Sequence, residues 1–255
     1  MNPWDLVIAN PVLNVLVALS HILGGSFGGA IIVLTIVVRL VTWPLNKRQL
    51  NSTRALQEMQ PKIQELQKKY GKNQQKLQQE MMKLYKEAGV NPLGCLWPML
   101  IQFPIWIALY QAILRALAVT PENLLDLAGR LYSWAVVNQA IPLSSTFLEL
   151  NLGLTGSQNG MLGLLLAIIV GGTMWVQQKM TQAPAVDARQ ESTSRIMLLM
   201  MPLMFGFLSF TFAAGLGLYW AVSNIIGIIT QYFATGGWGY LRASSTSQPA
   251  PAKGR

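Results

Sequence analysis

The sequence predicts an all-α integral membrane protein with five transmembrane helices, its N-terminus outside and its C-terminus in the cytoplasm. Three observations carry this prediction. Of the 255 residues, 52% are hydrophobic and only 11% are charged, whereas soluble domains contain about 25% charged residues. Apolar runs of about 20 residues, enough for a helix to cross a hydrocarbon core of about 30 Å, recur along the chain. Basic residues gather in alternate loops, as expected when positive loops stay in the cytoplasm.

Five segments have the length and hydropathy of a membrane span. They are residues 26–45, 93–115, 160–179, 196–214 and 216–234. Only a tight turn separates the last two, and its glycines, Gly215 and Gly217, supply backbone freedom. The stretch 196–234 is therefore expected to form an antiparallel pair of spans.

Residues 1–25 predict an amphipathic helix that lies in the outer membrane interface. The apolar part, residues 12–23, is too short to cross, and Asn14 and His21 lie opposite its apolar face. That face consists of Val12, Leu16, Leu19 and Leu23. The alternative, in which this segment belongs to a sixth span, remains open.

The distribution of Lys and Arg predicts the orientation. Ten of the 19 lie within residues 46–92, and others lie in the loop 180–195 and the tail 235–255. Residues 1–25 contain none, and the long loop 116–159 contains one. All the basic segments share one side if the N-terminus is outside, so 116–159 is an outer loop and 180–195 is cytoplasmic. The tail is expected to be disordered.

Residues 46–92 predict a cytoplasmic helical hairpin, because they are rich in Gln and Lys and carry narrow apolar seams. The seams are Leu56, Met59, Ile63, Leu66 and Tyr70, then Leu77, Met81, Leu84 and Ala88. Gly71 separates the two helices, Asn73 can cap the second, and Gly89 with Pro92 ends it.

Two interpretations of this hairpin stay open. It either packs only on itself, or it is a docking surface for an incoming chain, a ribosome or anionic headgroups. The docking residues would be Lys62, Lys68, Lys69, Lys72 and Lys76.

Arg39 is the only charged residue in the apolar stretch from Ala30 to Leu45. A guanidinium at that depth costs about 2.5–3.5 kcal/mol, and it cannot lose its proton. Lys47 is eight residues away, or about 12 Å of helix, which is farther than Arg39 can reach by snorkelling. No Asp or Glu lies within any expected span. Arg39 is therefore interpreted as a receptor for an anionic group, the alternative being an Arg bonded to backbone carbonyls.

Other polar side chains within the spans could share a water-filled recess with Arg39, although most such groups form only helix–helix hydrogen bonds of about 0.6 kcal/mol. The sequence predicts no metal site, because Cys95 and His21 are the only cysteine and histidine. It contains no phosphate-binding loop, zinc-protease motif or nucleophile elbow. We therefore expect neither an enzyme nor a cofactor.

A series of short motifs surrounds the basic hairpin in a specific order. They are Arg39 followed by Pro44-Leu45, Gln-Pro-Lys-Ile-Gln at 60–64, Asn-Pro-Leu-Gly-Cys at 91–95, Leu-Ile-Gln-Phe-Pro-Ile at 100–105 with Ala-Leu-Tyr at 108–110, and Gly-Leu-Gly-Leu-Tyr-Trp at 215–220 leading to Ser-Asn at 223–224. Together they resemble the YidC/Oxa family of membrane protein insertases over about residues 8–235.

This resemblance implies a five-helix core around a hydrophilic groove that is open to the cytoplasm and lipid and closed to the outside. The Arg would attract acidic residues in the short outer tail of a nascent membrane protein. Matched motifs place Arg39, Gln102 and Asn224 in the groove, and position adds Thr173 and Gln178.

The resemblance also implies the surroundings of the protein. It would lie in the bacterial plasma membrane, with the lipid bilayer and nascent chains as partners and without direct binding to nucleic acid. A ribosome and a Sec-type translocon stay open as further partners. Two alternatives also stay open: an anion-binding transporter or channel, and a scaffold that assembles membrane proteins without inserting them.

Overall fold

The computed structural model describes residues 2–71, 73–87, 89, 97–117, 121–133, 143–181, 188–235 and 237–238. The elements are η1 (Asp5–Ala9), α1 (Asn10–Ile22), α2 (Phe27–Glu58), α3 (Gln60–Tyr70), α4 (Gln74–Glu87), α5 (Trp97–Ala116), α6 (Pro121–Arg130), β1 (Thr146–Phe147), β2 (Leu150–Asn151), α8 (Gly160–Thr181), α9 (Ala188–Thr211) and α10 (Ala214–Thr235). The two strands form a small antiparallel hairpin. The described chain is otherwise helical or irregular, which confirms the all-α class.

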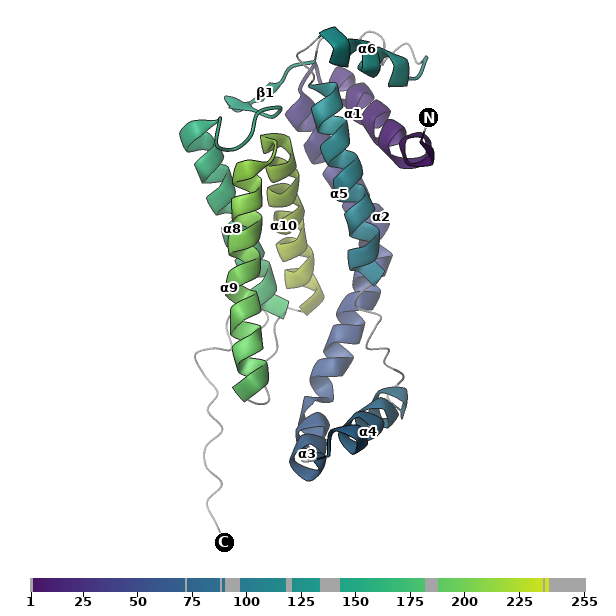
Figure 1. Ribbon diagram of the computed structural model, residues 1–255, viewed down its shortest axis with the longest axis vertical. Coiled ribbons are helices and arrows are strands. Elements are labelled where there is room, and N and C mark those ends of the chain that lie inside the picture. Colours follow the sequence, from purple (N-terminus) through teal and green to yellow (C-terminus); the bar gives the residue numbers. More distant parts are fainter. Residues whose placement is uncertain are drawn as a thin grey trace.

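Helices α2, α5, α8, α9 and α10 run along the main axis of the molecule (Figure 1). On one side α8, α9 and α10 pack together, and on the other α2 lies beside α5, while α10 also packs against α2. Helix α1 crosses obliquely near one end, close to α6, and α3 and α4 lie at the opposite end. The buried core is concentrated toward the α1 end. Its largest fully buried side chains include Leu13, Leu16, Phe27, Ile31, Leu109 and Ile113.

Among the described residues, five helices are long and apolar enough to cross a membrane. They are Asp5–Ile22, Phe27–Gln49, Gly160–Thr181, Ser192–Thr211 and Ala214–Ala234. The last four match the expected spans at 26–45, 160–179, 196–214 and 216–234. The remaining expected span, 93–115, corresponds to α5, and its first four residues lie outside the described ones. Its status as a span remains a prediction.

The N-terminal helix lies within the expected residues 1–25 and begins at Asp5, before the apolar part at 12–23. It forms 18 continuous helical residues, so the helix has the length of a span, which residues 12–23 alone lack. Pro11 lacks an N–H, and the preceding turn is a wide π-turn in which the N–H of Asn10 donates to the carbonyl of Asp5. Such a turn accommodates the proline without ending the helix. Its position in the membrane interface remains a prediction.

Helix α2 continues beyond the expected end of the first span. It ends at Glu58, and α3 begins at Gln60 after a break at Met59. The prediction of one helix along the apolar seam from Leu56 to Tyr70 is therefore wrong at this point. Pro61 lies in the first turn of α3, where its missing N–H is tolerated, and its ring disfavours a continuous helix through the preceding residues. At the other end of the hairpin, Asn73 Oδ1 accepts the N–H of Lys76 at 3.1 Å and caps α4. Ala88 and Pro92 lie outside the described residues.

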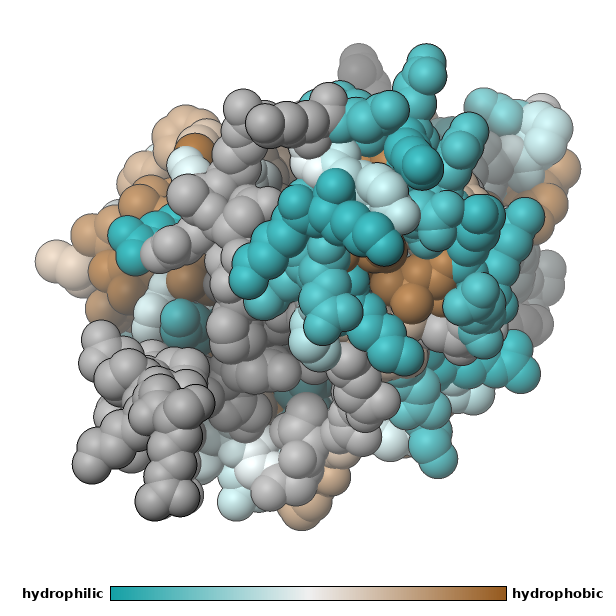
Figure 2. Space-filling view, turned by 90° about the horizontal axis from the view of Figure 1, so that it is seen from below, coloured by the Kyte–Doolittle hydropathy of each residue, from teal (hydrophilic) through white to brown (hydrophobic). Residues whose placement is uncertain are grey.

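The surfaces of the two ends and flanks differ in polarity. Figure 2 looks onto the end that carries α3 and α4, where hydrophilic residues dominate. Hydrophobic residues show along the flank where Figure 1 draws α8 and α9. On α9 the exposed apolar residues include Leu199, Met200, Leu203 and Phe207. An apolar flank of this kind suits contact with lipid.

Helices α8 and α9 approach each other closely through glycines. A Cβ built at Gly206 would lie 3.2 Å from the carbonyl oxygen of Ala167 and 3.8 Å from Cα of Gly171. Small residues at such crossings let the backbones come together, as is common in membrane helix pairs.

Candidate functional site

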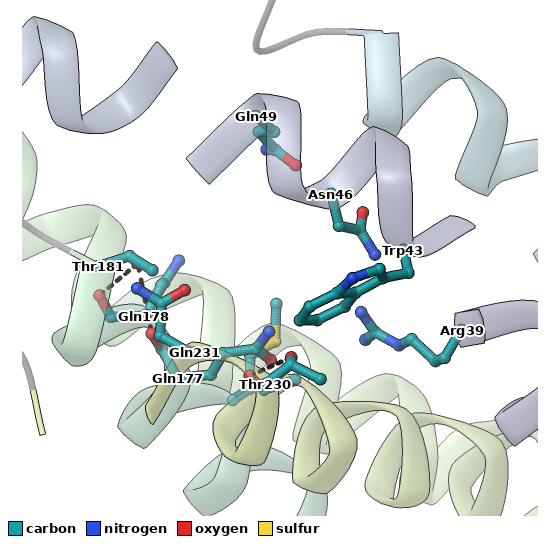
Figure 3. Close-up of a pocket in the computed structure, with 11 residues that line it drawn as sticks. Arg39, Trp43, Asn46, Gln49, Gln177, Gln178, Thr181, Thr230 and Gln231 are labelled. Atoms are coloured by element: carbon teal, nitrogen blue, oxygen red, sulfur yellow. Dashed lines mark hydrogen bonds between the residues drawn. The ribbon is translucent and has the colours of Figure 1, made fainter. Parts of the chain in front are cut away.

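A cavity of about 420 Å³ lies between α2, α8 and α10, in the half of the molecule nearer to α3 (Figure 3). Three helices line it at spacings of three and four residues, so each presents one face. The lining residues are Arg39, Trp43, Asn46 and Gln49 from α2, Met174, Gln177, Gln178 and Thr181 from α8, and Gly227, Thr230 and Gln231 from α10. Among the residues that the structure describes, the lining contains one cation and no carboxylate.

The guanidinium of Arg39 is held by a single residue of α10. Its Nε donates to Oγ of Ser223 at 3.0 Å, and its Nη2 donates to Oγ and to the carbonyl oxygen of Ser223, both at 2.7 Å. Within the described part of the chain, Nη1 has no hydrogen-bond partner and no carboxylate pairs with Arg39. The guanidinium is therefore fixed along one edge while Nη1 stays available. Arg39 thus has one feature of each interpretation. A backbone carbonyl accepts one of its hydrogen bonds, as in a structural Arg, and its guanidinium borders a cavity, as an anion receptor would.

Gln102 is connected to this guanidinium only indirectly. Its Nε2 donates to the hydroxyl of Tyr219 at 2.6 Å, and Tyr219, which is buried, lies four residues before Ser223, the partner of Arg39, on α10. Tyr219 thus lies between the two residues, and Gln102 does not line the cavity.

Asn224 and Thr173 pair with each other at the contact between α10 and α8. Asn224 Nδ2 donates to Oγ1 of Thr173 at 3.2 Å and to the carbonyl of Val170 at 3.3 Å. Neither side chain lines the cavity. Gln178 does line it, and its Nε2 lies 3.1 Å from Sδ of Met201. Of the five residues expected in a groove, Arg39 and Gln178 therefore share this cavity, while the other three do not line it.

Sequence reasoning missed several lining residues. From Arg39, a face of α2 continues through Trp43, Asn46 and Gln49, and this spacing was readable from the sequence. The indole of Trp43 points into the cavity on the same side of α2 as Arg39 (Figure 3). Ser223 carries no such signal, because it is 184 residues away from Arg39 in the chain.

The lysines expected on the hairpin are exposed wherever they are described. Lys62, Lys68, Lys69 and Lys76 face solvent, whereas Lys72 lies outside the described residues. The ammonium groups of Lys69 and Lys76 each lie 5.4 Å from the ring centroid of Tyr70, a cation–π distance. This contact ties the end of α3 to the start of α4 and keeps the two cations together.

A second charged cluster, near α1 and α6, is internally neutralised. Asp5 accepts from Arg115 at 2.9 Å and from Arg130 at 3.0 Å, and Arg130 also pairs with Asp126 at 2.8 Å. The Asp126 carboxylate raises the pKa of Arg130. Asn14 donates to the carbonyl of Arg130 at 3.0 Å. Here the cations have carboxylate partners, in contrast to Arg39.

No group of three His, Cys, Asp or Glu side chains that could hold a metal ion occurs among the residues that the structure describes. Cys95 is outside them.

A bundle of apolar helices around a polar cavity with a single cation defines the class: a polytopic α-helical membrane protein with a polar recess. The family model described as "60Kd inner membrane protein" matches residues 18–237. The chain is 36% identical over 237 residues to membrane protein insertase YidC 1 of Halalkalibacterium halodurans, covering 91% of this chain and 79% of that protein. It is 32% identical over 230 residues to the insertase YidC of Nitratidesulfovibrio vulgaris, covering 90% of this chain and 38% of that protein.

A solved structure agrees with these relatives. It is described as an active YidC insertase crystal structure with the first transmembrane domain resolved. It matches with a TM-score of 0.60 at 29% identity, over 91% of this chain and 47% of that one. The chain therefore belongs to the YidC/Oxa family of membrane protein insertases. It is a multi-pass protein of the bacterial inner membrane. The chain spans less than half the length of several curated relatives that it matches.

Proposed function

We propose that this chain inserts nascent membrane proteins into the bilayer and helps them fold, receiving their polar outer tails in the Arg39 cavity. One observation carries the proposal: a permanent cation borders a cavity whose described lining residues include several amides and no carboxylate. The proposed activity breaks no covalent bond and needs no cofactor.

Electrostatic attraction to Arg39 would lower the barrier for an acidic tail. A carboxylate about 4 Å from the guanidinium gains about 4 kcal/mol at an effective dielectric constant of 20. Placing an Asp at the centre of a spanning helix costs about 2.5–3.5 kcal/mol. The two energies are of similar size, so one cation offsets the cost of about one carboxylate. Groove roles for Gln102, Asn224, Thr173 and Gln178 are part of this proposal.

The hydrophobic segment of the substrate would supply the driving force. Each Leu, Ile, Phe or Val that enters the bilayer contributes about −0.3 to −0.6 kcal/mol. In this proposal the N-terminus lies outside, the C-terminus and the α3–α4 hairpin lie in the cytoplasm, and the hairpin lysines form a docking surface for the nascent chain. A ribosome or a Sec-type translocon would be a further partner of the same surface.

Purified protein in liposomes, supplied with a single-span protein that has an acidic outer tail, tests this function. We expect Arg39→Ala to lower insertion at least tenfold and Arg39→Lys to retain part of it, since a point charge still attracts a carboxylate. Lys47→Ala is the matched control, because it removes one positive charge from the exposed part of the same helix. Equal insertion by Arg39→Ala and wild type would refute the electrostatic role. Anion flux without insertion by the wild type would refute the insertase function.

A further inference from the structure

Side-chain amides are the most frequent polar groups in the described lining of the cavity, which contains a single charge. The polar uncharged groups are Asn46, Gln49, Gln177, Gln178, Gln231, Thr181 and Thr230. A site built for anions relies on cations and N–H donors. A carboxamide instead carries an acceptor oxygen as well as a donor NH₂ group. Attraction of anions by Arg39 therefore does not account for most of this lining.

We propose that these amides bind the peptide backbone of a substrate segment that passes through the cavity in extended form. The inference rests on the proposed insertase function and specifies the chemistry that the cavity recognises. A peptide unit has one N–H donor and one C=O acceptor, and a carboxamide offers the complementary pair. Because this match does not depend on substrate side chains, segments without acidic residues use it as well.

An extended segment needs such partners more than a helix does. A helix satisfies its own backbone, but with side chains it is about 10–12 Å wide. An extended chain is narrower and leaves its N–H and C=O groups unpaired. Each unpaired group away from water costs several kcal/mol. Amides along the path remove this cost at successive positions.

The length of the lined path fits a short peptide segment. Arg39 and Gln49 are ten residues apart on α2, which corresponds to about 15 Å of helix axis. An extended chain advances about 3.3–3.6 Å per residue, so about four residues fit along this length. Their roughly eight backbone polar groups are similar in number to the polar side chains of the lining.

The protein leaves much of this hydrogen-bonding capacity unused. Within the described part of the chain, the side-chain amides of Gln49 and Gln177 have no hydrogen-bond partner. Oε1 of Gln178 is buried without a partner, and its NH₂ group contacts only the weak acceptor Sδ of Met201. Gly227 preserves the space for Gln177, because a Cβ there would collide with that amide. The amides of Gln49 and Gln177 are thus positioned by the fold but not satisfied by it.

The test compares two single-span substrates in the liposome assay. Both carry a short uncharged outer tail of Ser, Gly and Asn, and in one of them backbone esters replace consecutive amides, which removes N–H donors. The variant is Gln49→Met with Gln177→Met, which keeps the side-chain length and removes the amides. The matched control is Gln75→Met with Gln79→Met on the exposed face of α4. Thermal unfolding in detergent verifies that each variant is folded.

We expect the cavity variant to insert the ordinary uncharged tail about tenfold more slowly than wild type, equivalent to about 1.4 kcal/mol. Wild type should insert the ester tail about as slowly as the variant inserts the amide tail. The variant should insert the ester tail only slightly more slowly than the amide tail. Arg39→Ala should change insertion of the uncharged tail less than twofold. The inference is overturned if the cavity variant and wild type insert the uncharged amide tail equally well. It is also overturned if the variant, compared with wild type, loses as much insertion with the ester tail as with the amide tail. Wild type that inserts neither uncharged nor acidic tails would instead refute the proposed function.

Discussion

Replacing Ser223 with alanine tests whether the fixed edge of Arg39 matters. The substitution removes the hydroxyl that accepts from Nε at 3.0 Å and from Nη2 at 2.7 Å. The carbonyl of Ser223 still accepts from Nη2, so Arg39 keeps one of three hydrogen bonds. The guanidinium then rotates more freely, and Nη1 no longer has a fixed position at the cavity.

The size of the effect follows from the two lost hydrogen bonds. Hydrogen bonds to charged groups contribute about 1.5–3 kcal/mol in soluble proteins, whereas side-chain bonds within membrane proteins average about 0.6 and reach about 1.7 kcal/mol. The charged donor places these bonds toward the upper end of the membrane range. We therefore expect the free energy of unfolding to fall by about 1–2 kcal/mol, and the insertion of acidic tails to fall several-fold.

Ser209→Ala provides the matched control for this measurement. Ser209 is also buried in a membrane helix, but its Oγ has no hydrogen-bond partner in the described structure. Removing it should leave stability unchanged or slightly raised. Reversible unfolding in mixed micelles and the liposome assay measure the two effects. If Ser223→Ala and Ser209→Ala behave alike in both, Ser223 does not position the guanidinium.

Three further substitutions probe other contacts. Tyr219→Phe removes the acceptor of Gln102 and should lower the free energy of unfolding by about 1 kcal/mol. A double-mutant cycle with Gln102→Met should show a coupling energy of that size. Additive effects of the two substitutions would contradict the hydrogen bond. Gly206→Leu should separate α8 from α9 and cost about 1–3 kcal/mol, whereas Gly172→Leu, where a Cβ meets nothing within 4 Å, should be nearly neutral in the same unfolding measurement. Asp5→Asn removes two ion pairs and should lower the unfolding temperature about twice as much as Asp126→Asn, which removes one; equal shifts would show that the cluster does not hold the N-terminal helix.

The sequence predicts the helical class well and makes Arg39 conspicuous, because both depend on local composition. Hydropathy is summed along consecutive residues, and one charge in an apolar run is visible without any tertiary information. The break before α3 was also accessible, since Pro61 marks it. The apolar periodicity from Leu56 to Tyr70 nevertheless favours one continuous helix.

Tertiary contacts account for what the sequence does not predict. The partner of Arg39 is a serine on a distant helix, and nothing in the composition around Ser223 distinguishes it from other polar residues of the spans. Asn224 was expected in the groove from its motif, yet its side chain contacts Thr173 and Val170 on α8. A shift of one position along a helix turns a side chain by about 100°, so adjacent residues of one motif face different neighbours.

Helix α2 is long enough to connect the two ends of the molecule. Its 32 helical residues form a rod of about 48 Å that connects the α1 end with α3. Pro44 interrupts the hydrogen-bond ladder of this rod, leaving the carbonyl of Leu40 without its usual partner, so bending is easiest there. Pro44 lies between Arg39 and Asn46, which line the same cavity. Bending at Pro44 would change the distance between Arg39 and the amides of Asn46 and Gln49, which lie on the other side of it.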